Sequence, residues 1–239
     1  MSPTLWLGLA AGILVVHFFR ERRLVARFAV GATRGERNPS RAALALATVI
    51  HQRIPRGKDP AFLGLEIPAL LGATPGAVLR RGGCCSGLSR LYVLALRSLG
   101  IRAAQITLYH ESGLARHALV EVRIGTDRWI VDPTYGFHYV DDAGRPLGLD
   151  ALRAGVEPSF RPFIAGGSDG YPLNNYYAFD YRRSKTANWT MTLWRRMTYP
   201  TLRLLTGGGI DTLRQPGFLE WPQLVVAGGV VAALICIWT

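Results

Sequence analysis

The chain is poor in cysteine and in acidic side chains. Three of its 239 residues are cysteine, and one of these, Cys236, lies in an apolar C-terminal stretch. So few thiols argue against a disulfide scaffold and favour a reducing compartment. The sequence also has no internal repeat, P-loop, zinc-spaced ligand set, calcium-binding loop or nucleic-acid-binding motif. We therefore expect no cofactor and no metal ion.

The shortage of acidic residues leaves a strong positive charge. Sixteen Asp and Glu residues stand against 28 Lys and Arg residues, which gives a formal net charge of +12, almost all of it from arginine. Such a surface suits nucleic acid, anionic lipid or an acidic polymer. Because nucleic-acid binding rests on charge alone, we expect membrane lipids as a partner and no nucleic acid.

Two apolar runs at opposite ends of the chain support the lipid interpretation. Residues 5–19 are apolar except for His17, are followed at once by arginines, and reach about 23 Å as a helix, slightly short of a bilayer core. Residues 222–238 form the second run, flanked by Trp221 and Trp238 as interfacial anchors. We predict an anchor helix within residues 1–23 and another within 219–239.

Two alternatives remain for these runs. One or both are buried core helices, or the first is a cleaved signal peptide, although its first four residues are uncharged and its arginines follow rather than precede it. Positive residues on the loop side of both runs place the central domain on the cytoplasmic face of the cell membrane.

The most informative stretch is residues 82–86, Gly-Gly-Cys-Cys-Ser. It precedes apolar residues that recur at three- and four-residue spacing up to Leu99, and Gly100 follows. This pattern predicts an amphipathic helix with Cys85 in its first turn. Free N–H groups and the positive end of the helix dipole there favour a thiolate and are able to receive an oxyanion.

Downstream, alternating apolar residues predict strands at 104–109, 117–124 and 128–132. If the turn is centred on Gly125 and Thr126, His117 and Asp132 are diagonal cross-strand neighbours, roughly 7 to 8 Å apart at the backbone. A slip of one residue separates them onto opposite faces. A thiol, an imidazole and a carboxylate in this order are the parts of a nucleophilic cysteine site.

Three blocks, at residues 83–101, 117–122 and 129–134, resemble the core of the transglutaminase-like superfamily. The resemblance implies an α+β, papain-like fold in which the cysteine helix packs on an antiparallel sheet. It makes Cys85 the nucleophile, His117 the base and Asp132 the orienting carboxylate. The distance to the Leu-Gly-Ile block selects Cys85 over Cys84, although the family usually has one cysteine in this motif.

The resemblance also implies thioester chemistry, in which Cys85 attacks an amide or ester carbonyl and water or an amine resolves the acyl-enzyme. Bacterial members are commonly protease-like or amidase-like, so we expect a membrane-anchored hydrolase of a peptide or amide-bearing polymer. The alternative is a non-catalytic accessory or scaffold subunit of a membrane complex, for example in envelope polysaccharide biosynthesis, that uses the same cleft for binding.

The rest of the chain is organised around this site. We predict a helix that is capped by Asn38 and ends near Arg53, a transglutaminase-like core over residues 38–140, and a loop-rich, aromatic and basic extension over 141–218. Residues 189–197 suggest an interfacial helix. We expect an aromatic cluster to pack over the core near the mouth of the active site: Tyr171, Tyr176, Tyr177, Phe179 and Tyr181.

Overall fold

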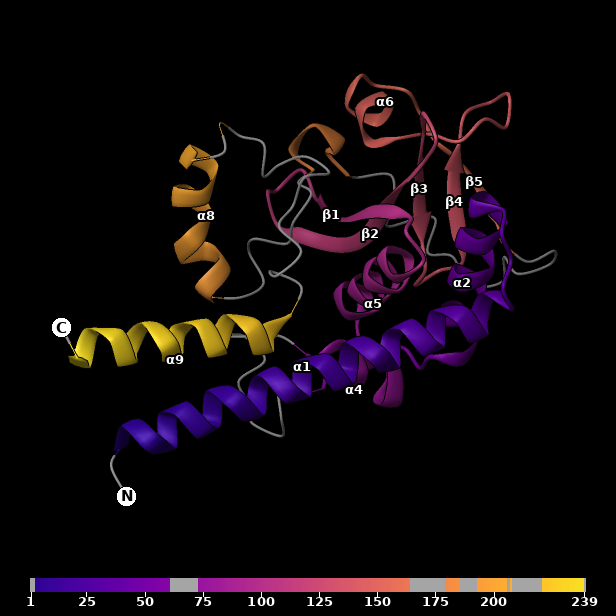
Figure 1. Ribbon diagram of the computed structural model, residues 1–239. Helices are drawn as coiled ribbons and strands as arrows, with labels where there is room; N and C mark the ends of the chain where they lie inside the picture. The colour runs from indigo at the N-terminus through magenta and orange to yellow at the C-terminus, as the bar shows by residue number, and fades with distance from the viewer. Residues whose placement is uncertain are drawn as a thin grey trace.

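An antiparallel sheet with helices on both faces forms the centre of the protein (Figure 1). The computed structural model describes residues 3–60, 73–163, 179–184, 193–205, 207 and 221–238. Over these residues the sheet has five strands in chain order: β1 (Arg102–Tyr109), β2 (Ala115–Ile124), β3 (Asp127–Asp132), β4 (Phe137–Val140) and β5 (Ser159–Pro162). The helical segments are α1 (Pro3–Thr33), α2 (Pro39–Arg53), α4 (Pro75–Arg81), α5 (Cys85–Ser98), α6 (Leu149–Arg153), the 3-10 turn η1 (Tyr181–Arg183), α8 (Leu193–Leu205) and α9 (Pro222–Trp238).

Helix α5 is the central element of the core. Its apolar side chains pack against Val120 and Val122 of β2 and against α2, where the Tyr92 hydroxyl donates to the carbonyl of Ala43. The helix ends at Gly100, whose φ of 78° terminates it as expected. The predicted α+β arrangement, a cysteine-bearing helix packed on an antiparallel sheet, is confirmed.

A second apolar cluster covers the other face of the sheet. Side chains of β1, β2 and β3 meet α6 there, and Phe179 and Tyr181 pack against the same cluster. These two aromatic residues therefore cover the face opposite α5, whereas Tyr171, Tyr176 and Tyr177 of the predicted aromatic cluster lie outside the described residues.

The segment predicted to be loop-rich contains regular structure. Helix α6 and strand β5 both fall within residues 141–163, and β5 completes the sheet by pairing with β4. These elements have five and four residues, too few for a hydrophobic period to be recognised between Gly148 and Gly155. Further along, α8 covers part of the predicted interfacial helix and extends it to Leu205, while Trp189 lies outside the described residues.

Helix α1 joins an exposed apolar half to a half that packs on the core. Its N-terminal side chains such as Trp6, Ile13 and Val16 are exposed, whereas Val25 and Ala29 are buried with α5. Within the described residues, α1 is the one helix long and apolar enough to cross a membrane, and only 22% of its most apolar window is buried. It runs to Thr33, beyond the predicted anchor of residues 1–23.

Helix α9 lies beside α1, and both extend away from the sheet at the same end of the protein (Figure 1). Phe18 and Trp221 meet edge to face with ring centroids 5.0 Å apart, and Leu14 is buried against Ala227. Ends that are 200 residues apart in sequence therefore form one helical pair.

A buried carboxylate fastens this pair to the core. Glu21 is 3% exposed, and its two oxygens accept hydrogen bonds from the Thr74 hydroxyl and the Gln223 amide, each at 2.7 Å. The guanidinium of Arg80 lies 3.8 Å away, and the Gln223 amide also contacts the ring of His17 at 3.1 Å. One side chain thus links α1, α9 and the N-terminus of α4.

We expect Glu21→Ala to lower the free energy of unfolding by about 3 kcal/mol, because it leaves two buried donors without an acceptor. Denaturant unfolding of the full chain in detergent measures this loss. Glu36→Ala is the matched control, since Glu36 pairs with Arg41 at the surface. Equal stability of the two variants would show that the buried carboxylate does not hold the helices together.

Candidate functional site

A tight turn places two thiols at the start of α5. Helix α4 ends at Gly82, whose φ is 85° and where a Cβ atom would lie 2.2 Å from the carbonyl oxygen of Pro55. Only glycine fits this position. The chain then reverses through Gly83, so that Cys84 caps α5 and Cys85 is its first residue. Gly82 and Gly83 therefore allow the turn that places the two thiols at the N-terminus of α5.

Asp59 fixes this turn from a distant segment. Its Oδ1 atom accepts a hydrogen bond of 2.8 Å from the backbone N–H of Cys84. A Cβ atom at Gly87 would lie 2.3 Å from the same oxygen, so the carboxylate fills the space that a side chain there would need. Sequence reasoning missed Asp59, because a lone aspartate in a loop carries no signal of a contact 25 residues away.

The two thiols act as one ionisable unit. The Cys84 side chain and burial raise the pKa of the Cys85 thiol above its ordinary value, while the backbone N–H of Ala118 opposes the shift. The pKa of Cys84 is lowered, so the helix start favours ionisation of Cys84 rather than Cys85. This differs from the expectation of a thiolate on Cys85 itself.

The helix N-terminus favours the thiolate at Cys84. The hydrogen bond from Cys85 lowers the pKa of Cys84, and the backbone N–H groups of Gly87 and Ser86 act in the same direction. Burial and the negative charge of Asp59 oppose this shift. The predicted effect of the helix start is therefore present, but it acts on the neighbour of the proposed nucleophile.

The hairpin brings His117 and Asp132 together. Val120 pairs with Val131 and Ile124 with Asp127, which centres the turn on Gly125 and Thr126. This is the register on which the sequence argument depended, and it is confirmed. The Nε2 atom of His117 lies 2.7 Å from Oδ2 of Asp132, and the two side chains are 6% and 0% exposed.

Asp132 is held so that it orients the imidazole. Its other oxygen, Oδ1, accepts the backbone N–H groups of Thr134 at 2.9 Å and Tyr135 at 3.1 Å. These contacts, together with the one to His117, fix the orientation of the carboxylate. When Nε2–H of His117 donates to this carboxylate, the ring's lone pair is on Nδ1, which is the tautomer a general base needs.

The start of α5 is joined to the start of β2, where His117 lies. The carbonyl of Ala118, the residue after His117, accepts the Ser89 hydroxyl at 2.9 Å, and the backbone N–H of Ala118 acts to lower the pKa of the Cys85 thiol. The charge of Asp132 also acts on the Cys85 thiol. The structure therefore brings the three predicted site residues to one place.

Two further side chains border this site. The ring of Tyr135 lies 5.3 Å from that of His117, and the guanidinium of Arg56 lies 5.8 Å from the centre of the Tyr135 ring. Burial raises the pKa of Tyr135, so its hydroxyl stays protonated as a donor. Sequence reasoning missed both residues. Within the part of the chain that the structure describes, no group of three or more His, Cys, Asp or Glu side chains is placed to hold a metal ion.

Comparison with known proteins supports one assignment. The family model described as the transglutaminase-like superfamily matches residues 26–133, a stretch that begins in the core-packed half of α1 and ends just after Asp132. No curated protein and no solved structure matches the chain. The matched stretch contains Cys85, His117 and Asp132 together with α5 and the β2–β3 hairpin. Residues 26–133 are therefore identified as a transglutaminase-like superfamily domain.

Proposed function

We propose that the protein is a membrane-anchored cysteine hydrolase that cleaves an amide bond in a peptide or amide-bearing polymer. The observation that carries this proposal is the buried 2.7 Å hydrogen bond between His117 and Asp132 beside the Cys85 thiol. A buried, carboxylate-oriented imidazole next to a thiol at a helix start is the arrangement that thiolate catalysis uses.

The reaction proceeds in two steps. In the first, the proton of the Cys85 thiol passes to Nδ1 of His117 while the sulfur attacks the carbonyl carbon. The carbon–nitrogen bond then breaks, and the leaving nitrogen takes the proton from His117. In the second, water attacks the thioester and gives a proton to His117, the carbon–sulfur bond breaks, and the thiol is restored. Asp132 stabilises the imidazolium in both steps.

The first turn of α5 supplies the donors for the oxyanion. Asp59 already occupies the N–H of Cys84. The oxyanion is therefore received by N–H groups deeper in the turn, beginning with that of Cys85. This keeps the developing charge on the side of Cys85 and away from the carboxylate of Asp59.

The ends of the chain support an anchored protein. The exposed apolar half of α1 is followed by the exposed arginines Arg20, Arg22 and Arg23, and α9 lies beside it. Positive charge flanking an apolar helix favours the cytoplasmic side of a membrane. This charge supports the proposal that the catalytic domain faces the cytoplasm.

One observation favours a second candidate function. The hydrogen bond to Cys84 keeps the Cys85 thiol protonated, which opposes nucleophilic attack. A site that retains the triad geometry without an activated thiol suits an accessory subunit that holds a partner of a membrane complex in the same cleft. The two functions differ in whether Cys85 is acylated.

We expect p-nitrophenyl acetate to acetylate Cys85, as detected by mass spectrometry of the acid-quenched protein. His117→Ala should slow this step by about 10² to 10⁴-fold, the usual contribution of a general base. His110→Ala is the matched control, because His110 contacts Ser112 in the β1–β2 loop and does not touch Asp132. Equal acetylation of the two variants would favour the accessory function.

Removal of the Cys84 sulfur should activate Cys85. Because Cys84 raises the pKa of Cys85, Cys84→Ala is expected to lower that pKa and to move the alkylation profile of Cys85 by iodoacetamide to lower pH. At neutral pH the variant therefore reacts faster at Cys85 than the wild type. Cys236→Ala should leave the profile in place, and an unmoved profile in Cys84→Ala would show that the two sulfurs ionise independently.

The orientation is tested with trypsin on sealed vesicles. The exposed residues 111–116, which cover the β1–β2 loop and the first two residues of β2, end at Arg116 and should be cut there in inverted vesicles. Right-side-out vesicles should be protected until detergent opens them. Cutting of intact right-side-out vesicles alone would place the domain on the outer face.

A further inference from the structure

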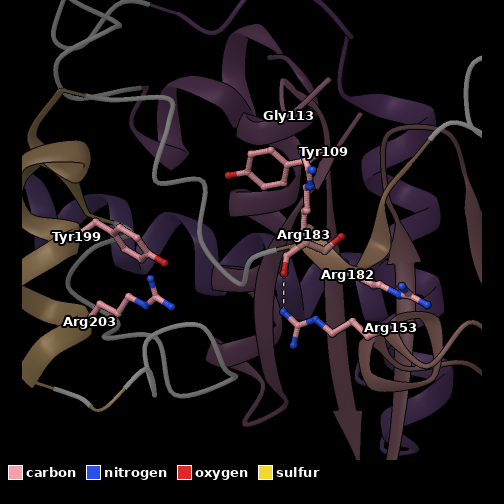
Figure 2. A pocket seen from close by; sticks show the side chains of 8 residues that line it. Tyr109, Gly113, Arg153, Arg182, Arg183, Tyr199 and Arg203 are labelled. Atoms are coloured by element: carbon pink, nitrogen blue, oxygen red, sulfur yellow. Dashed lines mark hydrogen bonds between the residues drawn. The ribbon is translucent and has the colours of Figure 1, made fainter. Parts of the chain in front are cut away.

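A cavity of about 400 Å³ lies between the end of β1, α6, η1 and α8 (Figure 2). Of its described lining residues none is acidic, and half are arginines: Arg153, Arg182, Arg183 and Arg203. These arginines come from three separate elements of the fold. Neither the superfamily match, which ends at residue 133, nor the proposed hydrolase chemistry uses them.

Nearby aspartates offset only part of this charge. Asp180 pairs with Arg183 at 2.9 Å. Asp150 lies 3.9 Å from Arg153 but is engaged more closely by Arg128. Among the described residues at the cavity, arginines therefore outnumber aspartates, and an anion in a partly enclosed space is attracted more strongly than in open water.

Two buried polar groups in the cavity wall lack hydrogen-bond partners among the described residues. They are the hydroxyl of Ser184, a residue that is 1% exposed, and the Nε–H of Arg153. The terminal nitrogen of Arg153 donates to the Ser184 carbonyl, which holds both groups at the cavity. Buried polar groups are normally satisfied, so these two are exceptions, and both belong to residues that line the cavity.

Side chains from opposite walls reach into the same space. Figure 2 shows Tyr199 and Arg203 extending from α8 toward the side where Tyr109 and Arg153 lie. Arginine forks and phenol hydroxyls together suit the oxygens of a phosphate group. The volume exceeds that of a single phosphate ion and lies in the range of small-molecule sites.

We propose that this cavity binds the phosphate group of an organic phosphate or diphosphate. The phosphate is carried either by a soluble molecule or by a lipid headgroup. Helix α8, which forms one wall of the cavity, also exposes the apolar side chains of Met197, Leu204 and Leu205. Exposed apolar side chains beside a cationic cavity make a lipid headgroup a candidate ligand as well as a soluble phosphate.

Thermal unfolding of the full chain in detergent tests this site with two probes. The first is inorganic pyrophosphate. The second is short-chain phosphatidic acid, compared with the matching diacylglycerol, which lacks phosphate. At least one phosphate-bearing probe should raise the unfolding temperature in a saturable way. Arg203→Gln should weaken that probe's affinity at least about tenfold, the loss expected for one charge-assisted hydrogen bond.

The matched control is Arg102→Gln, which removes an exposed arginine at the opposite end of β1 from Tyr109 and should leave the affinity unchanged. Because Arg203 is exposed on α8, its replacement does not disturb the core. Tyr199→Phe is a second test of the same cavity wall, and it changes no charge. A response to pyrophosphate identifies a soluble ligand, and a response to phosphatidic acid alone identifies a headgroup. No response to either probe, or equal affinity in Arg203→Gln and Arg102→Gln, would overturn the proposal.

Discussion

The burial of α5 between the sheet and the outer helices is the constraint on which the rest of the structure depends. Packing against Val120 and Val122 of β2 fixes the position of α5 on the sheet and its rotation about its own axis. The hydrogen bond from Ser89 to Ala118 then sets its first turn beside the start of β2. Because Cys85 and His117 lie at these two starting points, the geometry of the site follows from core packing. The surface loops add only the final adjustment, as Asp59 does at the turn.

The chemistry of the site is balanced between two sulfurs. A single cysteine at a helix start would feel the dipole and the N–H groups directly, whereas here Cys84 receives that stabilisation first. Ala118 and the charge of Asp132 both act on the Cys85 thiol. The raised pKa of this thiol favours its protonated form. The pKa is therefore lowered at Cys84 and raised at Cys85, the thiol that the superfamily motif selects.

Local signals predicted the elements that carry the site, and contacts between distant segments escaped prediction. Gly100 and the alternation on either side of Gly125 specified the end of α5 and the hairpin register, because each depends on neighbours in the chain. Asp59 and Arg56 gave no such signal, since their contacts exist only when the residues after α2 lie against the turn before α5. Helix α6 and β5 were missed because elements of five and four residues lack a readable period. The extension of α1 to Thr33 was missed because arginines interrupt its apolar pattern.

Helix α1 is continuous from the exposed apolar end to the core, and 31 residues make a rod of about 46 Å. If the outer half of this helix is the proposed anchor, no flexible linker separates the anchor from the core of the domain. Tilting its outer half would turn Glu21 against α4, whose end leads into the two thiols. In the proposed membrane-anchored hydrolase, the Cys85 thiol would therefore stay at a fixed height above the lipid. The proposed enzyme would then select scissile bonds by their distance from the membrane plane as well as by their chemistry.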